Sequence, residues 1–452
     1  MALPKSEVAG VILAAGFSTR FGGQKLTTSL AGRPLASWAI ESALASRLGR
    51  VVLVAQAETA QELTGLFPNL EVVLNPQAQE GQASSLRLGL EVLGSQYSHA
   101  LFLLADQPLI SSQLIDRFVK VAEERRGLAA LTGANSFSPP ALFARGYWPD
   151  LKSLQGDTGG RSVLEKYGDE AVFIAPDFPL AGLDVDTSEA LGRAEAVLTQ
   201  RYSGALELER GDLVSIVGAG GKTSLMEALA SEQAAQGKAV LATTTTHIFR
   251  PSGEVLIEPH EDWLPERIGR VLTPGACLTV ASESSVVQGR TKLKGLQHQN
   301  IDWLWEGALA PLILVEADGA RRLPLKAPRT HEPVLPLSTT VLVGVMGLSA
   351  LGQPVDEDHL LGASEFCAIT GAQPGQAVGP THLTALALHP KGLFKKAPGR
   401  TRKVVVLNQA DLPGAEQAAR QVAELMDRQD PSLRVLLTSL LQGACEVLCE
   451  GD

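Results

Sequence analysis

The chain has 452 residues, 45% of them hydrophobic, and a formal net charge of −10. This length suffices for two or three domains with apolar cores, and the acidic balance argues against a nucleic-acid partner, which needs a basic face. No signal-peptide pattern is present, and no apolar run reaches the ~18–20 residues of a membrane span, so we expect a cytoplasmic protein. The four cysteines form no CxxC pair, which favours free thiols over a zinc ribbon; on a helix, Cys445 and Cys449 would share one face.

Short apolar runs alternate with segments of helical periodicity through the first half. This alternation predicts an α/β fold, a doubly wound and mainly parallel sheet that binds ligands past the carboxyl ends of its strands. The apolar runs lie at 51–55, 71–74 and 100–105, and the helical segments at 34–47, 81–93 and 111–125.

A glycine-rich stretch, LAAGFSTRFGGQK, follows an apolar run that ends at Ile12 and that we expect to be the first strand. Glycines let backbone amides approach a phosphate closely, and cations supply the opposite charge; the alternative is a bare packing turn. We assign catalysis to Arg20 and Lys25 and, further along the chain, to Asp106. The nucleotide-binding candidates are Leu13, Ala14, Ala15, Gly16, Gly22 and Gly23.

Three aspartates are candidates for a metal site. Asp106 follows the apolar run 100–105, and a carboxylate there can hold Mg²⁺ against a triphosphate. Asp184 and Asp186 lie two residues apart, on one face if the segment is extended. Asp186 is the stronger candidate of the two, although Asp186 or Thr187 could instead cap the helix that follows.

LAAGFSTRFGGQK is similar to the LAAGxSxRxGxxK signature of nucleotidyltransferases. Together with NPQAQEGQASSLRLGL, LLADQPLI, LQGDTGGRSVL and DVDT, it resembles the molybdenum cofactor cytidylyltransferases (MocA-like) over about residues 8–200. The resemblance implies transfer of CMP from CTP to molybdopterin with release of pyrophosphate. Mg²⁺, Arg20 and Lys25 would stabilise the charge, and no protein nucleophile is needed. The guanylyltransferases have glycine at the position of Ala15 (LAGG in place of LAAG). The additional methyl group of Ala15 narrows the base pocket and favours a pyrimidine base.

Two further loop-to-helix segments are assigned to the substrates. Ser84, Ser85 and Arg87 open a predicted helix, and the resemblance places them near the cytidine; a plain capped helix is the alternative. The family often shows a Gly-His-Pro run, but this chain reads NSFSPPALFAR, which leaves a sugar or polyol phosphate open as the acceptor. By resemblance, the residues that face the pterin are Gly156, Asp157, Gly160 and Arg161.

A polar connection after Gln200 suggests a domain boundary, with domains at 1–203 and 204–452. The second domain opens with a strand, GAGGKTS and a helix, the form of a phosphate loop, here in the short GxxGKT spacing that resembles ATP-dependent Mur ligases. We therefore predict a second doubly wound domain, like the P-loop NTPases. Its nucleotide-binding candidates are Gly218, Gly220, Gly221, Lys222, Thr223 and Ser224.

Later motifs extend this second site. Glu316 and Asp318 end an apolar run like a Walker-B pair and, with Thr223, are candidate Mg²⁺ ligands. Asn408 and Asp411, in NQAD, resemble a base-reading motif of GTPases, although an ordinary turn is the alternative.

The order GAGGKT, TTTTH, VEADGA, KAPRTHEPVLP and NQAD resembles the selenium-dependent hydroxylase accessory proteins (YqeC-type) over about 211–450. The resemblance implies a domain that binds ATP or GTP and a molybdenum hydroxylase as the client. A different class of function stays open, in which both domains are maturation chaperones that deliver a cofactor with little turnover.

Overall fold

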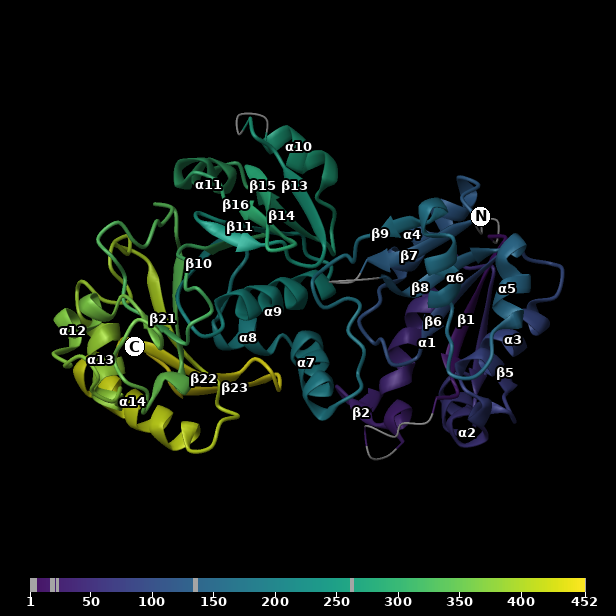
Figure 1. Ribbon diagram of the computed structural model, residues 1–452, viewed down its shortest axis with the longest axis horizontal. Coiled ribbons are helices and arrows are strands. Elements are labelled where there is room, and N and C mark those ends of the chain that lie inside the picture. The colour runs from purple at the N-terminus through teal and green to yellow at the C-terminus, as the bar shows by residue number, and fades with distance from the viewer. Residues whose placement is uncertain (1–5, 17–20, 22–23, 133–136, 261–263, 452) are drawn as a thin grey trace. The chain divides into compact units, whose positions relative to one another are not determined.

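The computed structural model describes residues 6–16, 21, 24–132, 137–260 and 264–451. The chain divides into two compact units, Met1–Ala194 and Glu195–Asp452, drawn with their element labels in Figure 1. The division falls inside helix α7 (Ser188–Thr199), nine residues before the predicted boundary.

The first unit is built on a seven-stranded sheet in the order β5-β4-β1-β6-β8-β7-β9. Strand β8 runs antiparallel to both of its neighbours, and the other pairings are parallel. Because β1 pairs with β4 on one side and β6 on the other, the strand order reverses at β1, which is where doubly wound folds open a ligand crevice. The strands are β1 (Val8–Ala14), β4 (Arg50–Ala55), β5 (Glu71–Leu74), β6 (His99–Leu104), β7 (Leu128–Thr132), β8 (Phe137–Ala144) and β9 (Val172–Ile174).

Helices cover both faces of this sheet. One face packs Val11, Val54 and Phe102 against α3, α5 and α6 in a continuous apolar core. Helices α1 and α4 contact each other on the opposite side, where the alternate strand residues point. The helices are α1 (Leu35–Ala45), α2 (Ala57–Leu66), α3 (Gln82–Leu93), α4 (Ser112–Glu123), α5 (Trp148–Ser153) and α6 (Arg161–Lys166); the pair β2 (Ser29–Leu30) and β3 (Arg33–Pro34) precedes α1.

The second unit is built on a nine-stranded sheet in the order β13-β14-β11-β17-β10-β19-β21-β22-β23. All neighbours are parallel except β22 and β23. The first strand, β10, lies near the middle between β17 and β19, again at a point where the order reverses. The strands are β10 (Asp212–Gly218), β11 (Val240–Thr244), β13 (Glu254–Ile257), β14 (Cys277–Ala281), β17 (Leu312–Glu316), β19 (Val341–Gly347), β21 (Arg402–Asn408), β22 (Arg434–Ser439) and β23 (Ala444–Cys449).

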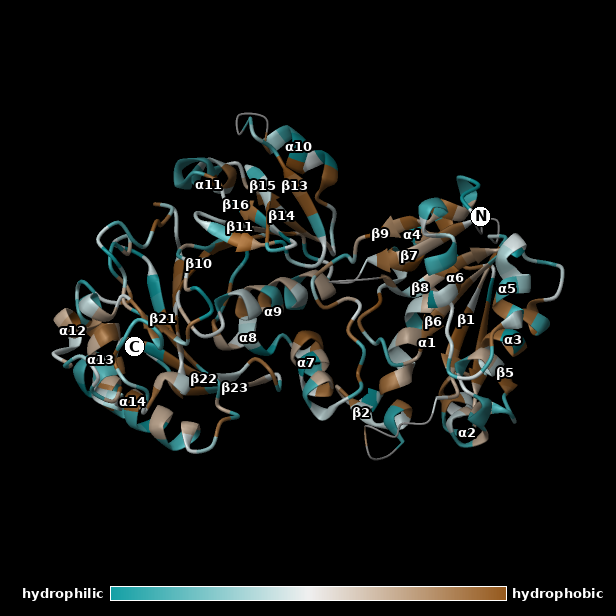
Figure 2. Ribbon diagram, viewed as in Figure 1, coloured by the Kyte–Doolittle hydropathy of each residue, from teal (hydrophilic) through white to brown (hydrophobic). Residues whose placement is uncertain are grey.

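Helices and two small sheets complete the second unit. In Figure 2 the central strand β10 is coloured mainly as hydrophobic, and every residue of β10 is buried, as expected for a strand covered on both faces. One small sheet joins β12 (His247–Phe249), β16 (Arg290–Lys294) and β15 (Glu283–Val287), and the other joins β18 (Leu325–Lys326) and β20 (Leu360–Leu361). The helices are α8 (Arg201–Ala205), α9 (Lys222–Ala235), α10 (Leu264–Val271), α11 (His298–Glu306), α12 (Ala363–Thr370), α13 (Pro380–Leu388) and α14 (Ala415–Gln429).

The predicted fold class is confirmed: both units are α/β, with mainly parallel sheets. All four cysteines are free, and Cys445 and Cys449 lie on strand β23 and not on a helix. Within the described ranges, no helix is both long and apolar enough to span a membrane.

Candidate functional site

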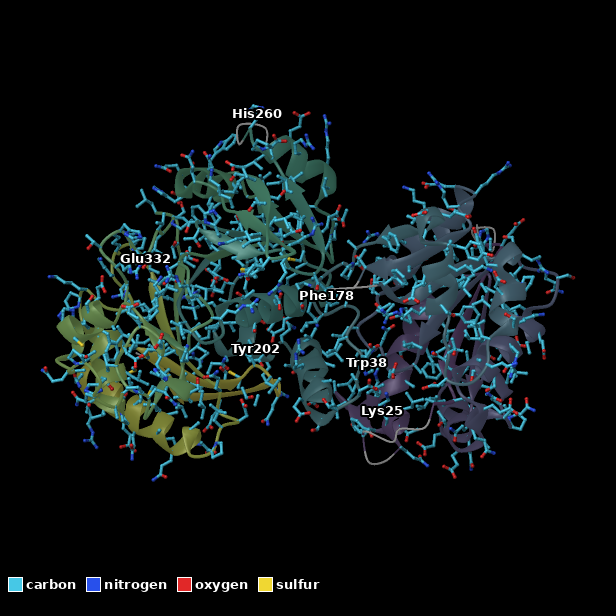
Figure 3. All side chains as sticks on the ribbon, viewed as in Figure 1. Lys25, Trp38, Phe178, Tyr202, His260 and Glu332 are labelled. Atoms are coloured by element: carbon cyan, nitrogen blue, oxygen red, sulfur yellow. The ribbon has the colours of Figure 1, made fainter. Side chains whose placement is uncertain are left out.

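The first candidate site is organised around Lys25, labelled in Figure 3, at the start of a short 3-10 helix. Its Nζ donates to Asp106 Oδ2 at 2.6 Å and to Asp186 Oδ1 at 2.7 Å. Asp106 follows β6, and Asp186 precedes α7. Three segments far apart in the sequence therefore meet past the carboxyl ends of the central strands.

The charged groups in this cluster shift one another's pKa values. Burial alone would lower the pKa of Lys25, but Asp106 and Asp186 more than offset it and raise that pKa. The pKa of Asp184 is raised to about 6, first because protein surrounds its carboxyl and second because Asp106 is negatively charged. Asp184 still reaches solvent, so the cluster is accessible to a ligand.

Thr187 resolves the alternative that the sequence left open at the start of α7. Its Oγ1 accepts a hydrogen bond from the Ala190 amide at 3.2 Å, as a helix cap does. Asp186 is instead paired with Lys25, so its carboxylate belongs to the candidate site.

A divalent cation would find oxygen ligands at this cluster. Asp106 Oδ1 is buried and accepts no hydrogen bond from any described residue. Among the described parts of the chain, no three Asp, Glu, His or Cys side chains form a ready-made metal cage. One or two carboxylates are what Mg²⁺ uses when nucleotide phosphates and water fill its other positions, so Asp106 and Asp186 fit such an ion.

Only part of the predicted glycine-rich loop can be located. Arg20, Gly22 and Gly23 lie outside the described residues. Leu13 and Ala14 end strand β1. Ala15 is buried, and its carbonyl accepts a hydrogen bond from Gln56 Nε2 at 2.8 Å, while Gly16 is exposed.

At the start of α3, Ser84 and Ser85 are both buried. Their hydroxyls accept hydrogen bonds from Asn75 Nδ2, each at 2.9 Å. Arg87 donates to the Leu154 carbonyl at 3.3 Å. These contacts tie the α3 N-terminus to the strand end before it and to the loop at 154, an anchoring role that the motif did not reveal.

The two segments that were predicted to contact the substrates approach each other at Gly81 and Gly156. Gly81 has φ of +92°, and a Cβ there would lie 2.4 Å from the Gly156 carbonyl carbon. The Gly156 carbonyl accepts the Ala83 amide at 3.2 Å. Asp157 follows in the same loop, so the segments assigned to the nucleotide and to the acceptor lie side by side. Gly160 and Arg161 begin α6, where Arg161 is exposed and pairs with Glu165.

The second candidate site is the turn between β10 and α9. Gly218, Gly220 and Gly221 all have positive φ, and a Cβ at Gly220 would lie 2.5 Å from Gly347. Lys222 is buried and donates to the Gly218 carbonyl at 2.7 Å. Thr223 and Ser224 are exposed on the first turn of α9. The glycines are therefore required by backbone conformation and close packing.

Two buried carboxylates face this turn from the end of β17. Thr223 Oγ1 donates to Glu316 Oε2 at 2.8 Å, and burial raises the pKa of Glu316 although Lys222 opposes the shift. Asp318 Oδ2 accepts the Gly218 amide at 3.1 Å. Lys222 Nζ lies 3.0 Å from Asp318 Oδ1, an ion pair without hydrogen-bond geometry. The predicted residues Lys222, Thr223, Glu316 and Asp318 are thus brought together.

Lys326, from KAPRTHEPVLP, extends the cluster. Its side chain is fully buried, and Nζ lies 3.2 Å from Asp318 Oδ2 and 2.8 Å from Glu332 Oε1. It also donates to the Gly319 carbonyl at 2.6 Å. Glu332 is labelled in Figure 3. Asp318 is therefore held between two buried lysines.

Asn408 holds the glycine turn. Its Nδ2 donates to the Gly220 carbonyl at 2.7 Å, and its Oδ1 accepts the Leu440 amide at 3.2 Å. Both ends of the amide are occupied by the protein, so in this structure Asn408 supports the loop and does not face an open base site. Asp411 is exposed and accepts a hydrogen bond from Ser439 Oγ at 2.6 Å.

Comparison with known proteins identifies the two units. The model of the MobA-like NTP transferase domain matches residues 10–171, and the model of the YqeC protein matches residues 214–363. The uncharacterized protein YqeC of Escherichia coli is 37% identical over 203 residues, which cover 44% of this chain and 77% of that protein.

Two further relatives are informative. The purine catabolism protein PucB of Bacillus subtilis is 34% identical over 191 residues, covering 40% of this chain and 92% of that protein. A probable molybdenum cofactor guanylyltransferase of Pyrococcus furiosus is 33% identical over 125 residues, covering 27% of this chain and 60% of that protein. These matches show that the chain joins a MobA-like NTP transferase domain to a YqeC domain in one polypeptide, and that its second part belongs to the YqeC family.

Proposed function

We propose that the first unit transfers CMP from CTP to the terminal phosphate of molybdopterin and releases pyrophosphate. The observation that carries the proposal is the bridge from Lys25 to Asp106 and Asp186, within a domain of a nucleotidyltransferase family. The name of the Pyrococcus relative supports a molybdenum cofactor as the acceptor, and Ala15 supports a pyrimidine donor.

The reaction needs positioning and charge stabilisation more than a protein nucleophile. An oxygen of the acceptor phosphate attacks the α-phosphorus of CTP, and the bond from that phosphorus to the bridging oxygen breaks as pyrophosphate leaves. Lys25 would exchange one carboxylate partner for the α-phosphate. Asp106 and Asp186 would hold Mg²⁺, which neutralises triphosphate charge when bound.

We propose further that the second unit binds ATP or GTP, with Mg²⁺, at the turn Gly218–Thr223, as P-loop proteins do. Lys222 would leave Asp318 and reach the β- and γ-phosphates, and Thr223 with Glu316 would hold the metal. This unit would assist maturation of a molybdenum hydroxylase, a selenium-dependent one by family resemblance. Fusion of the two units would keep cofactor synthesis close to its use.

The first unit is tested by pyrophosphate release from the full chain, with Mg²⁺, molybdopterin and CTP, GTP or ATP. We expect release with CTP and a loss of at least 100-fold in Asp106→Asn and Lys25→Gln. Asp150→Asn is the matched control because Asp150 pairs with Lys166 and Tyr167 and is not part of the Lys25 cluster. Lys222→Ala should keep the activity. No release with any nucleotide from folded protein would overturn the proposal, and release with a sugar phosphate in place of molybdopterin would replace the acceptor.

The second unit is tested by equilibrium binding of ATP and GTP to the full chain. We expect Lys222→Ala to weaken binding at least tenfold. Lys238→Ala is the matched control, since Lys238 lies beyond the other end of α9 and donates to Gln233. Equal binding by wild type and Lys222→Ala would show that the turn is not the nucleotide site.

A further inference from the structure

The small sheet of β12, β16 and β15 is anchored beside the glycine turn of the second unit. A Cβ at Gly295, just after β16, would lie 1.7 Å from the Thr244 carbonyl oxygen, and the Gly295 amide donates to Thr246 at 2.9 Å. Thr244 in turn lies opposite Glu316 in the register of β11 and β17. The small sheet is therefore packed against Thr244, which is adjacent to Glu316 of the candidate nucleotide site.

One face of this sheet gathers cations around an aromatic ring. Phe249 lies directly opposite Lys292, so both side chains point to the same face. The guanidinium carbon of Arg290 is 4.1 Å from the Phe249 ring centroid, and that of Arg322 is 5.2 Å from it. The ring thus holds two guanidiniums near each other by cation–π attraction.

Arg322 reaches this ring from a strained turn. Arg321 and Arg322 have φ of 50° and 65°, and the Leu323 amide donates to the Ala320 carbonyl at 2.9 Å. A turn with two left-handed central residues normally contains glycine or asparagine. Two arginines in it carry backbone strain, which is a feature of ligand-binding segments. The turn follows Asp318 of the candidate nucleotide site by two residues.

These cations are not neutralised by the protein. Within the described part of the chain, no ion pair involves Arg290, Lys292, Arg321 or Arg322, whereas neighbouring Lys294 pairs with Glu283. Arg290, Arg321 and Arg322 are exposed. Three of these cations, Arg290, Lys292 and Arg322, gather at Phe249 in a chain of net charge −10, and together they mark a local site for an anion.

We propose that Phe249, Arg290, Lys292 and Arg322 bind the phosphate or diphosphate group of a small molecule beside the nucleotide of the second unit. Guanidiniums match phosphate oxygens with paired N–H donors, and Phe249 preorganises two of them. The site adds a second ligand to the second unit, and it does not depend on the reaction proposed for the first.

The test measures protection of individual arginines from phenylglyoxal by mass spectrometry of the full chain. The probe is inorganic pyrophosphate, used with wild type and with Lys222→Ala so that binding at the glycine turn cannot produce the signal. We expect pyrophosphate to slow modification of Arg290 and Arg322 at least fivefold. Arg428, which pairs with Glu424 on an exposed helix face, is the internal control and should not change.

Two variants separate ligand binding from a structural role. Phe249→Leu should abolish the protection, and Phe249→Tyr should retain it. Arg322→Gly removes the left-handed strain, so we expect its urea midpoint to be unchanged or higher while pyrophosphate binds about tenfold more weakly. A lowered midpoint with unchanged protection of Arg290 would assign Arg322 to structure and overturn the proposal.

The source of the phosphate is distinguished by three further probes at equal ionic strength. Protection by glycerol 3-phosphate at similar concentrations would indicate a phosphomonoester, and protection by pyrophosphate alone a diphosphate. Equal protection by sulfate would show that the cations bind any anion without specificity for phosphate. Protection by an acidic peptide but not by pyrophosphate would indicate a surface that binds a protein. Either of the last two results would overturn the proposal.

Discussion

Replacing Lys326 by methionine is the sharpest test of the buried cluster in the second unit. Methionine preserves much of the side-chain volume but removes the charge that faces Asp318 and Glu332. Breaking a buried ion pair by deleting one partner costs about 3–5 kcal/mol. Asp318 keeps Lys222 at 3.0 Å, and Glu332 keeps the Arg329 amide at 3.2 Å, so we expect the lower end, about 3 kcal/mol.

Hydrogen exchange of backbone amides in the full chain measures this loss within one unit. The protected amides of β10 and β17 should exchange about 100-fold faster, since 1.36 kcal/mol corresponds to a factor of ten. Amides of β1 and β6 in the first unit serve as the internal reference.

Two further variants decide whether the charge network is responsible. Lys326→Met with Glu332→Gln should recover part of the loss, because one of the stranded charges is removed. Arg428→Met, whose partner Glu424 is exposed and 3.9 Å away, should cost less than about 0.5 kcal/mol. A change below about 1 kcal/mol in Lys326→Met would refute the reasoning that Asp318 and Glu332 depend on this lysine.

Three other expectations follow from single contacts. Burial raises the pKa of Glu232 from 4.5 to about 7, so the folded state holds its proton more tightly than the unfolded chain. Stability should then fall by at most about 3 kcal/mol as pH rises from 4.5 to 7, and urea titrations of Glu232→Gln should lose this slope. Gly81→Ala should force the loop at Gly156 away and cost about 1–3 kcal/mol; an unchanged urea midpoint would contradict the close approach. Thr187→Ala should lower stability by about 1 kcal/mol through loss of the α7 cap, with Thr187→Ser restoring it in the same titration.

The elements that the sequence predicted well are those with local causes. The segment 81–93 became α3 (Gln82–Leu93), and 71–74 became β5 (Glu71–Leu74), because periodicity and flanking turn residues act over a few positions. The glycines at 218, 220 and 221 were recognisable for the same reason, since a tight turn into a helix needs positive φ.

Contacts between distant segments were not accessible in this way. From the sequence we expected the hydroxyls of Ser84 and Ser85 to be free for a ligand at the start of a helix, yet both accept hydrogen bonds from Asn75. The sequence suggested that Asn408 contacts a base, yet its amide group donates to the Gly220 carbonyl and accepts hydrogen bonds from Thr438 and Leu440 at the end of β22.

The sequence by itself determined the two-part α/β organisation, the two glycine-rich turns and the residue types that a phosphate and a metal require. Only the tertiary structure decided which charges meet: Lys25 joins Asp106 and Asp186 across 81 and 161 positions, and Lys326 is buried against Asp318 and Glu332. The physical reason is that turns and periodicity are local properties of the backbone, whereas burial and ion pairing depend on which strands lie side by side in the sheet.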